Sequence, residues 1–455
     1  MEHVNTDTLA ALTSIVGAES ITTLPEKLAS GSKDCYHFSP VLIPQLDGKS
    51  AEVIVYPNNQ DELQKVLSLA AREKIPLVPR GAGTGNYGQC VTLNCGIMVN
   101  KRNLDNLLSL STTSARVEAG HILYKIEAAA AQVDAELRLF PSTVPTSSSA
   151  GFIAGGSGGI GSIEWGMLWE NDNILSATIY TLDDPSERVE LVAGELEGVL
   201  HNCGLTAFIS EVEFALAPRT SWHQYVIAFD DLKLALSAGE ALARDSDIRK
   251  RLITAFEWPI PSYFKPLRRG SAIPESKHLL FVYTDQPPEI IEGLSSALGG
   301  TVTFHQAPSQ DGGRGRQLYD YTWNHTTQWA MKADHELTYL QDRFDIDRLQ
   351  DQIEERKKAF PGEVFEHIEF IRSKGDVQAG GLTIVKFTSP DRLNELIEFS
   401  EEIGISVANP HTYFLNDDSR WYGEGFHAKK QRYDRLGLLN PVTFALLARN
   451  DLVAS

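Results

Sequence analysis

The sequence predicts a protein of mixed α and β structure with two or three domains. A chain of 455 residues is too long for one hydrophobic core, and 42% hydrophobic with 22% charged residues is ordinary for a folded protein. Residues 51–80 have the pattern of a β-α-β unit, and residues 96–215 alternate short apolar runs with an amphipathic one. Beyond residue 220 the segments are longer and richer in Trp, Tyr and His. We therefore expect a domain boundary near residue 220.

The first unit is a strand, a turn, a helix and a second strand. "VIVY" is a short β-rich run that Pro57 and Asn58 interrupt, and apolar residues then recur at helical spacing from Leu63 to Ala70. Residues 96–215 add the strands "GIMVN", "ARVEAG", "SATIYTL" and "AFISEVEFAL" and one helix, "HILYKIEAAAAQV". Later in the chain, "EVFEHIEFIRS" alternates as a strand does, and "DRLGLLNPVTFALLARNDL" has the apolar content of a packed segment.

Charge and composition exclude several classes of protein. A formal net charge of −19 repels nucleic acid and anionic lipid. The N-terminus lacks a basic leader, and every apolar run is shorter than the ~18 residues that would span a bilayer. The four cysteines are irregularly spaced, so neither a disulfide framework nor a zinc site is indicated. We expect a soluble cytoplasmic protein whose partner is a small-molecule substrate, with a homodimer as an open alternative.

Two glycine-rich stretches carry the strongest functional signal. In "LVPRGAGTGNYGQ", residues 77–89, Asn86 stands where a dinucleotide fingerprint needs its third glycine. The following "NYGQCVTLNCGIMVN" is strand-like, so no helix N-terminus is expected to receive a pyrophosphate. Alternating glycines still allow backbone N–H groups to converge on an anion. An anion-binding nest and a plain glycine turn both fit this loop.

The second stretch, "FPSTVPTSSSAGFIAGGSGGIGSIEWG", spans residues 140–166. A run of Ser and Thr precedes seven glycines between Gly151 and Gly166. Hydroxyl groups and bare amides can bind phosphate, ribityl and ring heteroatoms, and glycines let the backbone lie flat against a planar ligand. A flexible linker is the alternative, but the embedded Phe152, Ile153 and Trp165 indicate a packed segment.

The order of these segments resembles a known family. The β-α-β unit, "PRGAGTG", "VEAG", the second glycine-rich stretch, "ILSATIYTLDD" and "GLTAFISEVEFAL" follow one another as in the flavin-binding domain of the vanillyl-alcohol oxidase and p-cresol methylhydroxylase superfamily. Within it, the sequence is most similar to glycolate-oxidase-like and D-lactate-dehydrogenase-like FAD proteins. The resemblance implies an α+β fold: an FAD-binding domain of two subdomains and an α+β cap domain with an antiparallel sheet. The implied ranges are 1–219 (core about 40–217), 220–410 for the cap, and 411–455 packing back on the FAD-binding domain.

The resemblance also implies which residues bind FAD. The pyrophosphate loop corresponds to Arg80, Gly81, Ala82, Gly83, Thr84, Gly85, Asn86 and Tyr87. Residues along the ribityl chain and isoalloxazine correspond to Pro141, Ser142, Thr146, Ser149, Gly151, Gly155, Gly156, Ser157, Gly161 and Ser162, with two registers one residue apart in the serine run. Ile209 matches a residue near the adenine. Relatives with covalent FAD have a histidine where Thr84 stands, so we expect non-covalent FAD, with attachment by a cap histidine as the alternative.

The cap is expected to supply the catalytic residues. The candidates are His325, His367, Glu369, His411 and Tyr413, with Arg372 and Lys386 as anchors for a substrate carboxylate. His367 and Glu369 share one face of a predicted strand, and so do His411 and Tyr413 if "ISVANPHTYF" continues extended past Pro410. For each, an ordinary structural role is the competing interpretation. The resemblance implies an HxGDGNxH-like metal motif in hydroxyacid enzymes, which "NPHTYFLNDD" does not reproduce, so no metal is expected.

The predicted activity is hydride transfer to FAD from a carbon that bears a hydroxyl group, with a histidine as the base. A 2-hydroxyacid, an alcohol or a sugar would each fit, and oxidase and dehydrogenase remain open. The main alternative is a flavin-binding protein without turnover of its own, as an electron carrier or partner subunit. A nicotinamide-dependent enzyme is a third hypothesis, which the missing third glycine disfavours.

Overall fold

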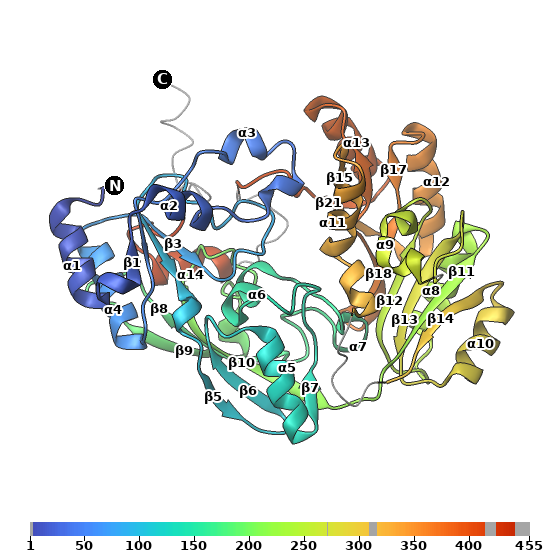
Figure 1. Cartoon of the computed structure of the whole chain (residues 1–455), viewed down its shortest axis with the longest axis horizontal. Helices are drawn as coiled ribbons and strands as arrows, with labels where there is room; N and C mark the ends of the chain where they lie inside the picture. Colours follow the sequence, from blue (N-terminus) through green and yellow to red (C-terminus); the bar gives the residue numbers. More distant parts are fainter. Residues whose placement is uncertain (1–2, 271, 309–315, 415–424, 442–455) are drawn as a thin grey trace.

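The computed structural model of this chain describes residues 3–270, 272–308, 316–414 and 425–441. Figure 1 shows two halves side by side, each built of sheets with helices packed on them. Residues 3–218 and helix α14 (Gly425–Tyr433) form the N-terminal half, and residues 223–408 form the second half, which we call the cap. The mixed α and β character predicted from the sequence is confirmed.

The first sheet of the N-terminal half is small and mostly parallel. Its order is β1-β2-β4-β3, with β2 and β3 parallel to β4 and β1 antiparallel to β2. The strands are β1 (Ile21–Thr22), β2 (Val53–Val55), β3 (Leu77–Arg80) and β4 (Ile97–Asn100), with helices α1 (Thr6–Val16), α2 (Pro25–Gly31), α3 (Ile43–Leu46) and α4 (Gln60–Arg72). Helix α4 buries the predicted apolar face between Leu63 and Ala70, and Asn59 caps it by accepting a hydrogen bond from the Glu62 N–H.

The second sheet is antiparallel, in the order β5-β6-β10-β8-β9, with β7 paired to the far end of β10. Its strands are β5 (Leu107–Leu110), β6 (Ser114–Glu118), β7 (Ala135–Leu137), β8 (Ile174–Tyr180), β9 (Arg188–Val192) and β10 (Phe208–Pro218). Helix α5 (Leu123–Ala130) is the helix that the sequence predicts. The sequence does not predict α6 (Ser149–Gly155) or α7 (Ser162–Trp165), because serine and glycine have low helix propensity. Burial of Phe152 and Ile153 on α6 compensates for that propensity.

The expectation of a strand-like segment after the first glycine loop is wrong for most of its length. Residues 81–96 form one long loop that connects β3 to its parallel neighbour β4, and the strand begins only at Ile97. Gly88, Cys95 and Gly96 have φ of 74°, 58° and 84°, which an extended strand does not allow. As predicted, no helix follows this loop.

The cap contains an eight-stranded sheet in the order β14-β11-β13-β12-β18-β19-β16-β21, and each strand in it is antiparallel to its neighbours. These strands are β11 (His223–Phe229), β12 (Lys250–Phe256), β13 (His278–Thr284), β14 (Thr301–Gln306), β16 (Gln341–Phe344), β18 (His367–Ser373), β19 (Asp376–Gly381) and β21 (Ser406–Ala408). A small sheet adds β15 (Leu337–Tyr339), β20 (Ile384–Lys386) and β17 (Val364–Phe365). The helices are α8 (Leu232–Arg244), α9 (Lys265–Arg269), α10 (Pro288–Ala297), α11 (Asn324–Ala333), α12 (Leu349–Ala359) and α13 (Pro390–Glu402).

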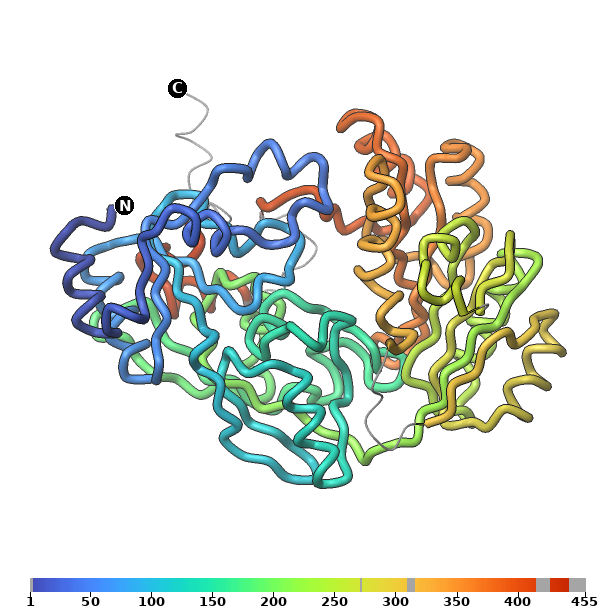
Figure 2. Tube along the Cα trace, in the orientation of Figure 1, coloured from blue at the N-terminus to red at the C-terminus, as the bar shows by residue number. Residues whose placement is uncertain are grey.

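The end of the described chain returns to the N-terminal half. Figure 2 shows this part in red among the blue and green N-terminal segments. The Leu77 N–H donates to the Leu438 carbonyl at 2.9 Å, and the Asn440 N–H donates to the Leu77 carbonyl at 3.0 Å, so this segment lies along β3. Among the described residues, we find no helix with the length and apolar character that a bilayer crossing requires. The domain limits inferred from the sequence remain a proposal.

Candidate functional site

The two glycine-rich stretches, distant in sequence, touch each other. A Cβ atom added at Gly81 would lie 2.3 Å from Ser148 Oγ and 3.3 Å from Gly151 Cα. A second contact joins Thr84 Oγ1 and Ser147 Oγ at 3.1 Å. The approach of the two backbones therefore depends on glycine at position 81.

The buried side chain of Arg80 packs against the first loop. The Arg80 side chain is 8% exposed, donates to the Lys33 carbonyl at 2.7 Å, and would meet a Cβ atom at Gly83 at 2.1 Å. Positive charge thus lies directly against a loop of bare amides, a combination that suits an anion. Asp34 lies nearby, and its burial raises its pKa to about 6, although hydrogen bonds from the Tyr36 and Gly88 N–H groups and the Arg80 charge act in the opposite direction.

Helix α6 presents a face of bare backbone. Gly151 and Gly155 are exposed one turn apart, while Phe152 and Ile153 on the other side are buried. A Cβ atom at Gly155 would have no neighbour within 4 Å. The Ser148 hydroxyl, at the start of this helix, is buried without a hydrogen-bond partner among the described residues. An open glycine face beside an unpartnered buried donor fits a large planar ligand with polar groups.

Several predicted cofactor residues have structural roles of their own. The Ser149 hydroxyl donates to the Glu118 carbonyl at 2.7 Å, and the Ser162 hydroxyl accepts from the Gly159 N–H at 3.0 Å. Gly161 has φ of 103°, and a Cβ atom there would lie 2.0 Å from the Arg138 carbonyl oxygen. Ile209 is 1% exposed within β10. The backbone N–H groups of Ser149, Gly161 and Ser162 also donate to protein carbonyls, so the described contacts of these residues are structural.

The remaining predicted residues of the second stretch vary in exposure. Thr146 is exposed, and its hydroxyl donates to the Thr143 carbonyl. Ser142 is buried, whereas Pro141 and Ser157 are half-buried. A Cβ atom at Gly156 would lie 2.7 Å from the Phe152 carbonyl oxygen. In the serine run, Ser147 and Ser148 face the first loop, although the predicted set contains their neighbours Thr146 and Ser149.

The cap meets the second stretch at the start of helix α11, and also where the Gly161 N–H donates to the Arg251 carbonyl of β12 at 2.8 Å. A Cβ atom at Gly158 would lie 3.4 Å from Cη2 of Trp323, the residue that precedes this helix. The Trp323 N–H donates to Glu369 Oε1 at 2.8 Å, and Trp323 itself has a φ of 51°. The hydroxyl of Thr254 also donates to Glu369, to Oε2 at 2.5 Å. A buried carboxylate on β18 therefore holds the residue that contacts the second glycine-rich stretch.

Trp323 and the two residues that follow it each have a buried polar atom without a partner among the described residues: Trp323 Nε1, Asn324 Oδ1 and His325 Nδ1. Burial, assisted by the positive charge of Lys332, lowers the pKa of His325 to about 4. His325 is therefore neutral at pH 7. Native proteins rarely leave buried polar atoms unpaired, so this cluster indicates a ligand or ordered water.

His367 and Glu369 lie together as the strand pattern predicts. His367 Nε2 is 2.9 Å from Glu369 Oε1, and the imidazole stacks on Phe256 with 4.8 Å between ring centres. Both side chains are almost completely buried, and His367 Nδ1 has no partner within the described residues. In the tautomer with its proton on Nε2, His367 donates to the Glu369 carboxylate and has its lone pair on Nδ1.

The expectation that His411 and Tyr413 share a strand face is wrong, because β21 ends at Ala408 and His411 lies in the following turn. His411 Nδ1 is 2.7 Å from Ser39 Oγ, and its Nε2 is 2.8 Å from the Tyr339 carbonyl oxygen, so both ring nitrogens are engaged. Tyr413 packs against a separate small cluster with Leu42 and Leu46. Residues 415–418 of "NPHTYFLNDD" lie outside the described residues.

The two proposed carboxylate anchors make other interactions. Arg372 donates to the Gly375 carbonyl at 2.7 Å. Lys386 is exposed and pairs with Glu336 at 3.3 Å. Arg372 also donates from Nε to the carbonyl of Ile163, in the second glycine-rich stretch, at 3.4 Å, whereas the described residues show no such contact for Lys386. The assignment of both as carboxylate anchors remains a prediction.

Further side chains tie the cap to the first loop. Asn86 donates to the Tyr339 hydroxyl at 2.5 Å, and Gln341 donates to the Tyr87 hydroxyl. Burial raises the pKa of Tyr87 well above its usual value, so this phenol stays protonated. The predicted loop residues Asn86 and Tyr87 therefore position the loop against the cap through their side chains.

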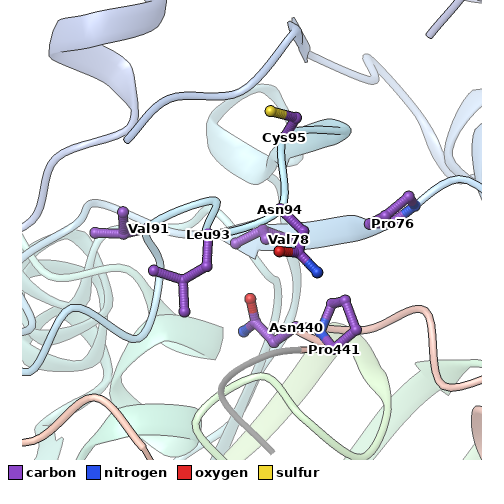
Figure 3. Close-up of a pocket in the computed structure, with 8 residues that line it drawn as sticks. All are labelled: Pro76, Val78, Val91, Leu93, Asn94, Cys95, Asn440 and Pro441. Carbon is purple, nitrogen blue, oxygen red and sulfur yellow. The ribbon is translucent and has the colours of Figure 1, made fainter. Parts of the chain in front are cut away.

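One part of the site is not predicted from the sequence. Gly204 packs closely on the strand before the first loop, since a Cβ atom there would lie 2.8 Å from Pro79 Cγ. At the end of the loop, the Asn440 side chain donates to the Gln89 carbonyl at 3.0 Å. Figure 3 shows Asn440 and Pro441 opposite Val78 and Leu93, in a small pocket beside the first loop. Only the tertiary structure shows that the end of the described chain supports this loop, because hundreds of residues separate the two.

A comparison with known families identifies the cofactor. Residues 51–185 match a family model described as an FAD binding domain. This chain is an FAD-binding protein. The matched residues include both glycine-rich stretches of the FAD-binding protein, and the expectation of FAD is confirmed.

Similar proteins belong to the superfamily that the resemblance indicates. Glycolate oxidase subunit GlcD from Escherichia coli K12 is 26% identical over 223 residues, which are 46% of this chain and 44% of that protein. D-lactate dehydrogenase from Archaeoglobus fulgidus is 28% identical over 141 residues, which are 30% of this chain and 31% of that protein. The FAD-binding protein thus spans less than half the length of these curated relatives.

Solved structures support the fold over the whole FAD-binding protein. Alkyldihydroxyacetonephosphate synthase superposes with a TM-score of 0.72 and 16% identity, covering 97% of this chain and 87% of that chain. An identity this low shows the fold alone. The fold class expected from the sequence, an α+β FAD-binding domain of the p-cresol methylhydroxylase type with an α+β cap, is confirmed.

Proposed function

We propose that this protein is an FAD-dependent oxidoreductase that oxidises a CH–OH group of a small molecule by hydride transfer. One observation carries the proposal: Trp323, which contacts the second glycine-rich stretch, begins a run of three residues, Trp323 to His325, that each have a buried polar atom without a partner among the described residues. A reacting substrate needs such donors and acceptors beside the flavin, whereas a purely structural contact would pair them.

The residues of the N-terminal half would hold the cofactor. The amides of residues 81–85 with Arg80 beneath them suit the pyrophosphate, and the open face at Gly151 and Gly155 with the Ser148 hydroxyl suits the remainder. Bound FAD would supply the hydride acceptor. Since Thr84 is hydrogen-bonded to Ser147 and has no nucleophilic nitrogen, we propose that this loop binds FAD non-covalently.

His325 is the base that this site favours. It is neutral at pH 7, and its Nδ1 can take up the hydroxyl proton of a substrate as the C–H bond breaks. His367 is the second candidate, because Glu369 orients its ring and its Nδ1 is unpartnered among the described residues. The engagement of both nitrogens of His411 disfavours that residue as a base. Tyr413 packs in a different cluster and has no evident part in proton transfer.

The names of two relatives support a 2-hydroxyacid as the substrate class. One relative is named a glycolate oxidase subunit and another a D-lactate dehydrogenase. Glycolate and D-lactate are both 2-hydroxyacids. This sequence lacks the metal motif of the hydroxyacid branch, so alcohols and sugars are alternative substrates. The polar atoms of Trp323 and Asn324 would orient any of these hydroxylated molecules equally well.

The test begins with the absorption spectrum of the purified protein, followed by anaerobic titration with hydroxyacids, alcohols and sugars. We expect flavin bands that bleach with one class, and flavin in the supernatant after acid precipitation. His325→Asn should retain the flavin bands and slow bleaching about 10²-fold or more, the usual range for loss of a general base. Equal bleaching rates in His325→Asn and the parent would reject His325 as the base, and flavin in the acid pellet would reject non-covalent binding.

A second function is a flavin-binding partner subunit without turnover of its own. It is favoured by one specific observation, that the glycolate oxidase relative is named as a subunit. Flavin bands without bleaching by any compound of the panel, together with reduction by dithionite, would support this alternative and contradict the oxidoreductase.

A further inference from the structure

Three chemically different side chains meet on the N-terminal half, at the starts of strands β2 and β4. They are His3, which precedes α1, Glu52, which precedes β2, and Cys95, in the turn before β4. One ring nitrogen, one carboxylate oxygen and the sulfur all lie within 4.8 Å of one another. Within the described part of the chain, this is the one group of three such side chains at that spacing.

Glu52 is held in place by backbone groups of both neighbouring segments. Its Oε2 accepts from the Val4 N–H at 3.1 Å and from the Gly96 N–H at 3.0 Å. Its own N–H donates to the Gly96 carbonyl at 3.0 Å. These bonds direct the other oxygen, Oε1, to a position 2.8 Å from His3 Nδ1. The carboxylate is therefore oriented before any ion arrives, as metal ligands commonly are.

The backbone presents Cys95 to solvent. Cys95 has φ of 58° and Gly96 has φ of 84°, so the chain reverses at this point and leaves the thiol exposed. Figure 3 shows the Cys95 side chain apart from Pro76, Asn440 and Pro441 and turned away from them. Free cysteines are usually buried as small apolar residues, and this one is not.

We propose that His3, Glu52 and Cys95 form a zinc site, with water as the fourth ligand. Imidazole nitrogen, thiolate sulfur and carboxylate oxygen are the three ligand types that Zn²⁺ takes in proteins, whereas Ca²⁺ and Mg²⁺ require oxygen ligands only. On binding, the Cys95 S–H bond breaks, the Zn–S bond forms, and the proton passes to solvent. No electron is transferred. The ion would link the N-terminal segment to the starts of the two central strands of the first sheet, β2 and β4.

Irregular cysteine spacing conceals such a site in the sequence. The three ligands are separated by more than forty residues each, whereas recognisable zinc motifs place ligands a few residues apart. The proposal replaces the expectation that the protein has no metal site.

The test is titration of the reduced protein with Zn²⁺ by calorimetry and with Co²⁺ by absorption. We expect one ion per chain, release of about one proton, and a thiolate-to-cobalt charge-transfer band. Cys95→Ser should abolish that band, and His3→Ala and Glu52→Gln should weaken Zn²⁺ binding about tenfold or more. The amide introduced by Glu52→Gln keeps an oxygen that can accept from the Val4 and Gly96 N–H groups, so a loss of binding there reports the ligand rather than the fold.

Cys35→Ser is the matched control, since Cys35 is a partly exposed free thiol outside the group. It should bind Zn²⁺ as the parent does, and circular dichroism should be the same for all variants. A parent protein that takes up no Zn²⁺ would overturn the proposal. Undiminished binding and an unchanged cobalt band in Cys95→Ser would also overturn it, because the ion would then lie elsewhere.

Discussion

At the scale of single residues, three histidines of similar sequence context have different surroundings. His325 has an Nδ1 without a partner among the described residues, His367 shares a buried hydrogen bond with Glu369, and His411 is bonded at both nitrogens. Hydrogen bonding and burial therefore separate a candidate base from a structural residue. His411 links Ser39 of the N-terminal half to Tyr339 of the cap, so it contributes to stability.

The first prediction is a pH dependence of stability that originates at His411. Burial lowers its pKa in the folded protein from 6.5 to about 4, although the Tyr339 carbonyl opposes the shift. The unfolded chain therefore binds a proton that the folded one does not, and stability is full above pH 6.5 and falls as pH decreases toward 4. The loss from this group should be roughly 2–3 kcal/mol in the free energy of unfolding. Urea denaturation across this pH range measures it.

His411→Asn should lose less stability than the parent between pH 7 and pH 4. The exposed His335→Asn provides the control and should follow the parent. Parallel pH profiles for His411→Asn and the parent would show that this histidine is not the origin of the effect.

At the scale of elements, helix α6 is short and has glycines at both exposed positions of one face. Gly151 and Gly155 leave one face open, whereas Phe152 and Ile153 anchor the other in the core. The first loop has a similar arrangement, because the Arg80 side chain packs against its glycines at Gly83. We propose that in both elements glycine lowers intrinsic stability and gives the cofactor access to the backbone.

The second prediction concerns Gly155→Ala. A Cβ atom there meets no protein atom within 4 Å, so the apoprotein should become more stable by up to about 1 kcal/mol through helix propensity. The same methyl group would occupy the proposed FAD surface, and the FAD dissociation constant should rise about tenfold or more, a cost of about 1.4 kcal/mol. Thermal unfolding of the apoprotein and fluorescence titration with FAD measure the two effects.

Gly293→Ala is the matched control, since Gly293 lies exposed within α10 of the cap and has equal space around it. It should be stabilised in the same way and bind FAD normally. Unchanged FAD affinity in Gly155→Ala would mean that this face of α6 does not contact the cofactor.

At the scale of the whole molecule, a buried polar junction joins the cap to the second sheet. Arg251 of β12 donates to the Leu137 carbonyl at 2.8 Å and to Glu136 of β7 at 3.3 Å, and Trp222 also donates to Glu136 at 3.0 Å. The Arg251 and Glu136 side chains are 9% and 8% exposed. This junction fixes the orientation of the cap, and with it the distance from α11 to the second glycine-rich stretch.

The third prediction is that Arg251→Met destabilises the protein by about 3 kcal/mol, because it leaves the buried Glu136 carboxylate without its cation. Burial already raises the pKa of Glu136 even in the presence of Arg251. Urea denaturation measures the loss. Arg249→Met is the control, since Arg249 is 42% exposed and 3.7 Å from Glu164, and it should cost less than about 1 kcal/mol. Equal losses in the free energy of unfolding of the two variants would contradict the proposed role of the junction.

The sequence predicts the order of the elements well where periodicity is strong. The apolar face of α4, the alternation at His367 and Glu369, and the strands of the second sheet all follow from residue spacing. It fails at residues 86–96, where positive φ angles break an apparently strand-like run, and at α6, where burial overrides a low helix propensity. These failures occur within residues 51–185, the range that matches the FAD binding domain model.

By itself, the sequence determined the cofactor and the fold class, because two glycine-rich stretches in a fixed order between strands are local features that the chain carries wherever it folds. Only the tertiary structure decided which residues meet. It placed Ser148 against Gly81, Trp323 against Gly158, and Asn440 beside the first loop. Such contacts depend on packing between segments far apart in the chain, and periodicity along a chain holds no information about them.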